Sequence, residues 1–297
     1  MEIQIEPIST IIRKYFLFTI LAATIFTACQ KAVDDTGGGS NSLPAQTLLN
    51  VSYGSDAQQK MDVYLPAGRS SATTKVIIMV HGGGWSTGDK ADFSDYVDTI
   101  KKRQPDYAIF NINYRLAAGT SNTFPTQEND VKEAYEFIIS KTGEYHISQK
   151  FALLGASAGG QLALLQAYKN STTVKPKAVA DFFGPTDMTI LYNTMNPLAQ
   201  PLLAAIVGAT PTTNPTIYQQ SSPINYVTAQ SMPTIIFQGG MDPVVPPTQS
   251  AALDAKLQLL GVTHQLVFYP TEGHSWVGAN LSDSFDKLQA FLAANVN

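Results

Sequence analysis

Residues 151–168 of the chain read FALLGASAGGQLALLQAY, a short apolar run followed by small residues and then by helix-forming residues. The first four residues predict a buried strand and the last eight predict a helix. Between them, residues 155–159 form the pattern G-x-S-x-G, whose small side chains let a strand turn sharply into a helix. Such a turn exposes the hydroxyl of Ser157 and lets the N–H of Ala158 face a bound molecule. Ser157 is therefore a candidate nucleophile.

Strand-like and helix-like segments alternate along the chain from about Gln46 to the C-terminus. Residues 47–52 and 60–65 flank a Gly-Ser-Asp turn and predict an antiparallel hairpin. Six apolar runs predict buried strands, at residues 76–80, 107–112, 151–154, 178–183, 234–237 and 265–269. Apolar residues at helical spacing predict helices at 127–140, 250–260 and 282–294. The sequence therefore predicts one α/β domain over residues 46–297, with a mostly parallel central sheet flanked by helices.

The segment 184–232 is longer than one crossover needs and is rich in Pro, Thr and Asn. It predicts a small cap insertion of one or two helices over the cleft. The alternative is an irregular surface insertion that makes no contact with a ligand.

Histidine and a carboxylate are the partners that a catalytic serine needs, because a base must remove the hydroxyl proton and an acid must orient the base. The chain has four histidines. His274 lies in a loop just after the predicted strand 265–269, and we expect it to be the base. The other three suit structural roles, in a glycine-rich loop, in a polar turn and at the start of a strand: His81, His146 and His264.

Asp242 is the expected acid, because it follows the predicted strand 234–237 and completes the chain order serine, aspartate, histidine that this kind of turn predicts. The competing acids are placed less well. Asp181 lies inside a predicted strand. Asp187 starts a cap segment, where helix capping is the default role. Glu272 is too close in sequence to His274 to orient it easily.

A glycine-rich loop, His81-Gly82-Gly83-Gly84-Trp85, follows the predicted strand 76–80. Acyl transfer places negative charge on a carbonyl oxygen, and backbone N–H groups must already point at that position. We expect the N–H groups of Gly83, Gly84 and Ala158 to form this oxyanion hole, although the glycines alone are also compatible with a simple tight turn. His81 would then fix the loop. A metal site is not expected, because no two histidines have ligand spacing and the single cysteine lies near the N-terminus.

Several motifs resemble those of the α/β-hydrolase superfamily, and within it the esterase branch near the hormone-sensitive-lipase-like enzymes. They are HGGGW at 81–85, GDK at 88–90, NYRL at 113–116, GASAGG at 155–160 and GHSW at 273–276. The resemblance covers the chain from about Gln46 onward. Residues 53–54, 61–66 and 222–224 look most like those of bacterial feruloyl and acetyl-xylan esterases.

Three features depart from that pattern or refine it. The large N-terminal cap of the hormone-sensitive-lipase-like enzymes has no counterpart, which favours a more open site. Gln238 replaces the histidine that often precedes the acid loop in relatives, a change that we do not expect to affect the chemistry. Asp130 resembles a family position that we interpret as structural.

Aromatic side chains near strand ends are as often core as substrate contacts, which leaves both roles open for Trp85, Phe124, Tyr192 and Trp276.

The resemblance implies a serine carboxylic-ester hydrolase that works through an acyl-enzyme and needs no cofactor. It implies, as substrates, small acyl or hydroxycinnamoyl esters of polysaccharides or small molecules. The alternatives are a prolyl-oligopeptidase-like serine peptidase, a kynurenine-formamidase-like amide hydrolase, and a glycan-binding envelope protein with a vestigial site.

The N-terminus has the layout of a secretory signal, because Arg13 and Lys14 precede an apolar stretch over 15–28 that is too short to span a membrane. The stretch ends in Phe-Thr-Ala-Cys, which resembles a bacterial lipobox and implies a lipid anchor on Cys29; the alternative is a free thiol in a cleaved peptide. We therefore expect a lipoprotein signal at 1–28, a flexible tether at 29–45 and a membrane-anchored protein of the bacterial cell envelope. A net charge of −4 without a basic cluster disfavours nucleic acid as a partner.

Overall fold

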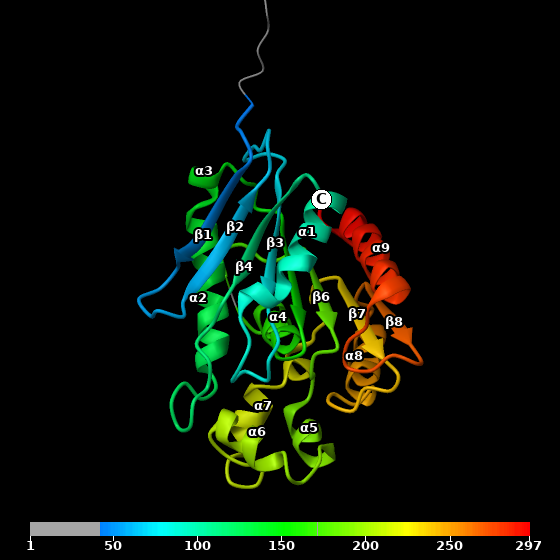
Figure 1. Ribbon diagram of the computed structural model, residues 1–297. Helices are drawn as coiled ribbons and strands as arrows, with labels where there is room; N and C mark the ends of the chain where they lie inside the picture. Colours follow the sequence, from blue (N-terminus) through cyan, green and yellow to red (C-terminus); the bar gives the residue numbers. More distant parts are fainter. Residues whose placement is uncertain (1–41, 171) are drawn as a thin grey trace, which may run out of the picture. The chain divides into compact units, whose positions relative to one another are not determined.

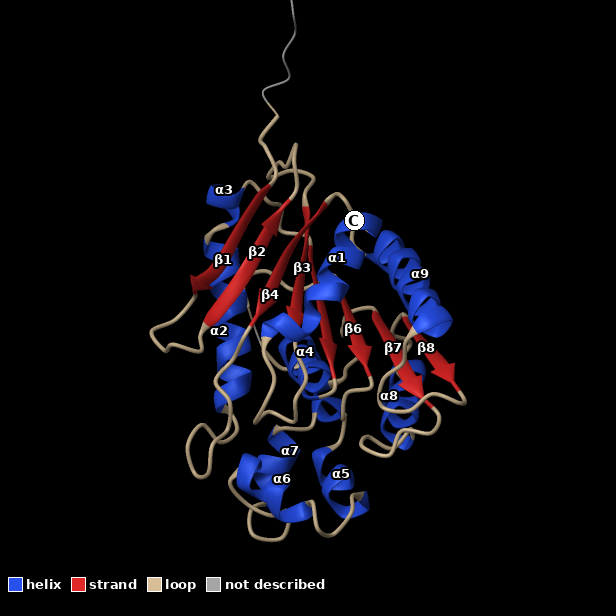
Figure 2. Ribbon diagram, viewed as in Figure 1, coloured by secondary structure: helices blue, strands red, loops and turns tan. Residues whose placement is uncertain are grey.

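The computed structural model describes residues 42–170 and 172–297, and eight strands within them form one mixed sheet (Figures 1 and 2). In chain order they are β1 (Gln46–Ser52), β2 (Lys60–Leu65), β3 (Lys75–Val80), β4 (Tyr107–Ile112), β5 (Phe151–Ala156), β6 (Ala178–Phe182), β7 (Thr234–Gly239) and β8 (His264–Tyr269). Across the sheet the order is β1-β2-β4-β3-β5-β6-β7-β8. β1 and β2 pair antiparallel, β2 is antiparallel to β4, and all later pairs are parallel. The predicted hairpin and the mostly parallel sheet are confirmed.

Helices cover both faces of the sheet. On one face α4 (Ala158–Tyr168) packs on β3, β5 and β6, α8 (Thr248–Leu259) packs on β7 and β8, and α2 (Thr126–Ser140) packs on α4. On the other face α1 (Ser94–Arg103) packs on β4 and α9 (Gly278–Asn295) packs on β6 and β7. Two short helices, α3 (Thr142–Tyr145) and the 3₁₀ helix η2 (Lys90–Phe93), follow α2 and precede α1. None of the described helices combines the length and the apolar character that crossing a membrane requires.

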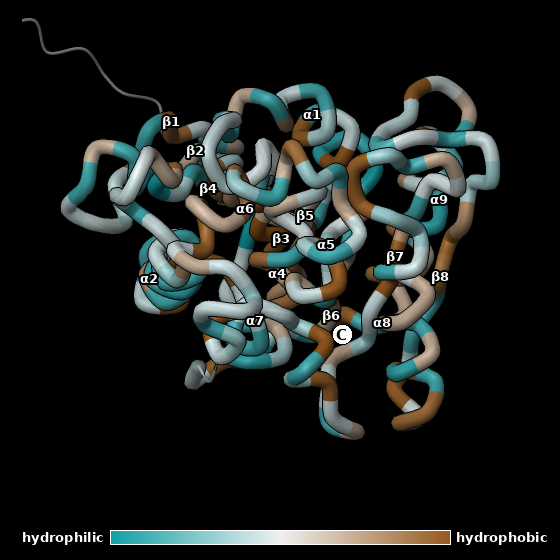
Figure 3. The backbone as a smooth tube through the Cα atoms, turned by 90° about the horizontal axis from the view of Figure 1, so that it is seen from below, coloured by the Kyte–Doolittle hydropathy of each residue, from teal (hydrophilic) through white to brown (hydrophobic). Residues whose placement is uncertain are grey.

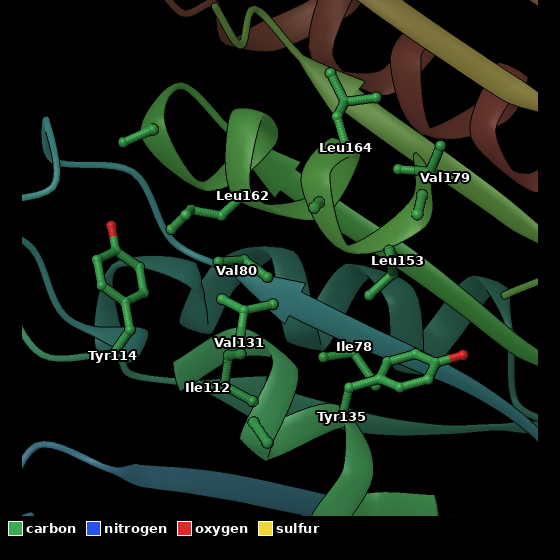
Figure 4. Close-up of a cluster of buried hydrophobic side chains, with 14 of the residues drawn as sticks. Ile78, Val80, Ile112, Tyr114, Val131, Tyr135, Leu153, Leu162, Leu164 and Val179 are labelled. Carbon is green, nitrogen blue, oxygen red and sulfur yellow. The ribbon is translucent and has the colours of Figure 1, made fainter. Parts of the chain in front are cut away.

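The core lies on both sides of the sheet because its central strands are buried on both faces. In β3, Ile78 and Val80 join one apolar cluster, whereas Ile77 and Met79 join the other. Successive strand residues point to opposite faces, so a strand buried on both sides is mainly apolar at consecutive positions. Figure 4 shows Ile78 and Val80 among side chains of the first cluster, together with helix residues such as Leu162.

The predicted cap segment contains three α-helices, α5 (Met188–Thr194), α6 (Gln200–Val207) and α7 (Pro215–Gln220), and the 3₁₀ helix η3 (Pro223–Tyr226), rather than one or two helices. Each α-helix is short and has its own start signal: Asp187 caps α5, and proline lies in the first turn of α6 and of α7. The three helices lie beyond the carboxyl ends of the parallel strands (Figure 1), and α5 and α6 overlie the central strands when seen from that edge (Figure 3).

Candidate active site

Ser157 occupies the turn between β5 and α4, as the sequence predicted, with φ 55° and ψ −124°. A residue other than glycine rarely adopts this conformation, so the surrounding structure must hold it. Ser157 N–H donates to the carbonyl of Phe182 in the neighbouring strand at 2.8 Å. A Cβ on Gly159 would lie 2.0 Å from the carbonyl oxygen of Val80. The turn therefore needs glycine at this position to let α4 approach the sheet.

Three loops at the carboxyl edge of the sheet bring Ser157, His274 and Asp242 together. His274 Nε2 lies 2.9 Å from Ser157 Oγ, and His274 Nδ1 lies 2.7 Å from Asp242 Oδ2. Because the carboxylate can only accept, Nδ1 carries the proton, and Nε2 accepts the hydrogen bond from the serine hydroxyl. This is the arrangement in which an imidazole can remove the hydroxyl proton.

Asp242 is fixed by a turn of its own loop. Its Oδ1 accepts from the N–H groups of Val244 at 2.8 Å and Val245 at 2.9 Å, which leaves Oδ2 for the histidine. Burial alone would raise the pKa of the Asp242 carboxyl, but the hydrogen bonds from His274, Val245 and Val244 outweigh it and hold the pKa below its ordinary value. The acid therefore stays ionised at neutral pH.

Gln238 also contacts this acid, although its replacement of a histidine was not expected to affect the chemistry. Its Nε2 lies 3.3 Å from Asp242 Oδ2, and its Oε1 accepts from the hydroxyl of Ser250 at 2.7 Å. The amide is thus oriented from α8 and turns its donor toward the carboxylate. Nothing in the local sequence signals this contact, because it depends on Ser250, which lies in the following helix α8.

The competing acids have structural positions. The carboxyl of Asp181 is fully buried in β6 and accepts from the N–H of Gly184 at 3.0 Å, and burial raises its pKa to about 7. Asp187 caps α5 by accepting from the N–H of Ile190 at 2.9 Å. Glu272 accepts from the side chain of Asn280 at 2.6 Å.

The other histidines are also held away from the serine. The ring of His81 stacks on Tyr114 with 4.4 Å between centroids, and burial lowers its pKa, so this imidazole stays neutral. His146 ends α3, and His264 opens β8 beside Asp254. Asp130, interpreted as structural, is buried and binds Arg115 and Gln59.

The glycine-rich loop has three successive residues with positive φ, Gly83 at 107°, Gly84 at 55° and Trp85 at 59°. A Cβ on Gly83 would lie 2.1 Å from the carbonyl oxygen of Thr87, so this position requires glycine. Gly84 faces open space instead. Within residues 42–170 and 172–297, no backbone carbonyl outside the regular helix and strand pairing accepts from the N–H of Gly83, Gly84 or Ala158. These donors are free to bind an anionic oxygen beside Ser157.

A cleft of about 720 Å³ opens over these groups, and Ser157, His274, Gly83 and Gly84 lie in its lining. Its walls are mainly apolar. They include Trp85 and Phe183 next to the serine and cap residues such as Leu191, Met195, Leu203 and Ile206. Among the described residues that line it, Asp92 and His274 are the only acidic or basic side chains. The cleft is therefore suited to a neutral, largely apolar group.

Phe183 was not anticipated, and of the four aromatic residues that the sequence left open only Trp85 lines this cleft. Phe183 follows β6 with φ 46°, and its ring centroid lies 4.8 Å from that of His274. It also borders a small apolar recess of about 20 Å³ that Trp276 helps to line. Its place just after a strand, at the same edge as the other site residues, is the signal that could have revealed it.

No group of three or more His, Cys, Asp or Glu side chains in the described part of the chain is arranged to hold a metal ion. The predicted lipidation residue, Cys29, lies outside the described residues.

Comparison with known proteins places this chain in a family. The BD-FAE family matches residues 61–257. A probable carboxylic ester hydrolase of Mycobacterium tuberculosis, LipM, is 30% identical over 211 residues, which cover 67% of this chain and 48% of that protein. The chain thus spans about half the length of this relative.

Two solved structures have the same fold. A bifunctional GH43-CE protein of Bacteroides eggerthii has a TM-score of 0.72 and 26% identity, and the match covers 82% of this chain and 38% of that one. A truncated carbohydrate esterase from gut microbiota has a TM-score of 0.69 and 25% identity, and the match covers 82% of this chain and 96% of that one. The predicted resemblance to α/β-hydrolase esterases is confirmed.

Proposed function

The chain belongs to the BD-FAE family of α/β-hydrolases, and on this basis we propose that it is a serine carboxylic-ester hydrolase that works through an acyl-enzyme. The observation that carries the proposal is the pair of hydrogen bonds from Ser157 Oγ to His274 Nε2 at 2.9 Å and from His274 Nδ1 to Asp242 Oδ2 at 2.7 Å. Beside them lie free backbone donors and a cleft with few charges.

The first half of the proposed reaction forms the acyl-enzyme. His274 Nε2 takes the hydroxyl proton while Ser157 Oγ forms a bond to the ester carbonyl carbon. The carbonyl oxygen becomes negative and is bound by the N–H groups of Gly83, Gly84 and Ala158. When the bond to the alcohol oxygen breaks, the proton on Nε2 passes to that oxygen and the alcohol leaves.

Water completes the reaction by the same route. His274 Nε2 removes a proton from water, and the water oxygen adds to the acyl carbon. The bond between Ser157 Oγ and the acyl carbon then breaks, the proton on Nε2 passes to Oγ, and the carboxylic acid product leaves. Asp242 stays ionised throughout and stabilises the protonated imidazole. Its lowered pKa fits this role.

Small acyl or hydroxycinnamoyl esters of polysaccharides are the substrates that we propose. The mainly apolar walls suit a neutral acyl group, and the solved carbohydrate esterase is a structural neighbour. Acetylated xylan and p-nitrophenyl acetate would be compared at matched acetyl concentrations. Acetate release from the glycan at a rate comparable with that of the small ester supports the assignment, and hydrolysis of the small ester alone contradicts it.

Replacement of the nucleophile tests the reaction itself. We expect Ser157→Ala to lower kcat for p-nitrophenyl acetate by on the order of 10⁶-fold, as removal of a triad nucleophile does in a serine hydrolase. Near-ultraviolet circular dichroism checks that the variant is folded. A folded variant with the wild-type rate would show that Ser157 is not the nucleophile.

We also propose that the protein is held at the bacterial cell envelope by a lipid on Cys29. The support is the sequence pattern of residues 13–29 alone. In cells fed an alkyne-labelled fatty acid, the wild-type chain should carry the label and sediment with membranes, whereas Cys29→Ser should lose both properties. An unlabelled wild-type chain would refute the anchor.

A further inference from the structure

One buried amide joins three separate parts of the site. Gln161 lies in the first turn of α4, four residues after Ser157, and only 1% of it is exposed. Its Oε1 accepts from the indole Nε1 of Trp85 at 3.0 Å, and its Nε2 donates to the carbonyl oxygen of Ser221 at 2.7 Å. These partners are 76 and 60 residues away in the chain. A flipped amide would place like atoms together at both ends, so its orientation is determined.

The first partner, Trp85, belongs to the glycine-rich loop that carries the proposed oxyanion donors. It has φ 59°, a conformation that its side chain disfavours, and it directly follows Gly83 and Gly84. Two hydrogen bonds hold it: the indole bond to Gln161, and its carbonyl, which accepts from the N–H of Ala117 at 2.9 Å. The directions of the glycine N–H groups therefore depend on where the indole is held.

The second partner, Ser221, lies where the cap returns to the main domain. Its N–H donates to the carbonyl of Ile217 in α7. The next residue, Ser222, accepts from the N–H of Met188 at the start of α5. Both ends of the cap segment thus meet at this turn, and Gln161 holds the turn against the helix that begins beside the nucleophile.

We infer that Gln161 is a positioning residue that keeps the oxyanion loop, the nucleophile helix and the base of the cap in one fixed arrangement. It touches no reacting atom and acts through Trp85 on the N–H groups of Gly83 and Gly84. The inference rests on the proposed serine-hydrolase function. Because the oxyanion forms only as the carbonyl is attacked, misplaced donors weaken binding of the transition state more than binding of the substrate.

Gln161→Leu tests this role, because it keeps a similar volume and leaves the indole N–H and the Ser221 carbonyl without partners. We expect kcat for p-nitrophenyl acetate to fall about 10- to 100-fold with KM within about twofold, a smaller loss than removal of a direct donor causes. Gln166→Leu is the matched control. Gln166 is in the same helix, is fully buried and contacts Asn170 rather than the loop, so its kcat should stay within about twofold. Equal effects of the two variants would overturn the inference.

Trp85→Phe probes the same hydrogen bond from the other side and is the milder change if Gln161→Leu does not fold. It should also lower kcat, and an unchanged kcat would overturn the inference. If the two residues act through this bond, the double variant loses no more activity than the worse single variant. Losses that multiply would show that they act separately.

Tryptophan fluorescence gives a readout that does not depend on turnover. The chain has two tryptophans, so Trp276→Phe leaves Trp85 as the only indole. In that background Gln161→Leu should shift the emission maximum, because the buried indole loses its hydrogen-bond partner, whereas Gln166→Leu should not. An unshifted spectrum contradicts the inference. If Ser157→Ala keeps the wild-type rate, the proposed function fails. If Ser157→Ala abolishes the rate while Gln161→Leu behaves as Gln166→Leu, only the present inference fails.

Discussion

At the scale of single residues, hydrogen bonds fix Asp242 and His274 so that one imidazole nitrogen faces Ser157. Asp242 gives Oδ1 to its own loop and Oδ2 to His274. His274 in turn has Nδ1 fixed and Nε2 directed at Ser157 Oγ. Chain order and position after strands predicted these three residues. The supporting contact of Gln238 could not be predicted, because its partner Ser250 is positioned only by the packing of α8.

Asp242→Asn should lower kcat by about 10⁴-fold with the fold intact, because an amide cannot both accept from the Val244 and Val245 N–H groups and accept from His274 Nδ1–H. Steady-state hydrolysis of p-nitrophenyl acetate measures the loss. Asp187→Asn is the matched control, since asparagine also caps a helix and Asp187 does not contact the histidine. A similar loss in both variants would argue against Asp242 as the acid.

At the scale of elements, the sequence predicted those segments whose pattern is local. The turn after β5 was found from its small residues, and β3 and β4 from continuous apolar runs. Helix α1 was not anticipated, because its buried face consists of Val97 and Ile100 among charged neighbours. The cap helices were undercounted because they are only 7, 8 and 6 residues long, too short for a clear helical repeat. Contacts between distant segments, such as Trp85 with Gln161, leave no local pattern at all.

Gly83→Ala tests the glycine-rich loop as an element. Gly83 has φ 107°, and an alanine Cβ there would lie 2.1 Å from the Thr87 carbonyl oxygen. The loop must therefore move, and kcat should fall by about 10²-fold. Gly119→Ala is the control, because Gly119 also has positive φ but a Cβ there meets no atom within 4 Å. It should cost about 1 kcal/mol of stability and leave kcat unchanged. Equal rates in the two variants would refute an oxyanion role for the loop.

At the scale of the whole molecule, a sheet buried on both faces explains the fold and also the unusual position of one carboxyl group. The central strands carry apolar side chains on both faces of the sheet, and this pattern made the α/β architecture predictable. Asp181 lies inside this core with Oδ2 unpartnered among the described residues, and burial raises its pKa to about 7 from an ordinary value of 3.8. The folded protein therefore keeps this proton at pH values where the unfolded chain has released it.

This difference predicts how stability depends on pH. Between about pH 4 and pH 7 the folded state binds more protons at Asp181, so the free energy of unfolding should fall as pH rises through this window and level off above it. The loss amounts to at most about 4 kcal/mol for a shift of this size. Urea unfolding at pH 5 and pH 8 should show a smaller difference in Asp181→Asn than in the wild type. Identical differences would mean that Asp181 ionises normally in the folded protein.

The central claim is that Ser157 is a nucleophile activated by His274, and covalent labelling tests it most directly. Diisopropyl fluorophosphate reacts with activated serines by losing fluoride, and peptide mass spectrometry locates the adduct. We predict one adduct, on the peptide that contains Ser157, with esterase activity lost in proportion to labelling and no adduct in His274→Ala. An adduct on a different serine, or full esterase activity after complete labelling of Ser157, would contradict the account.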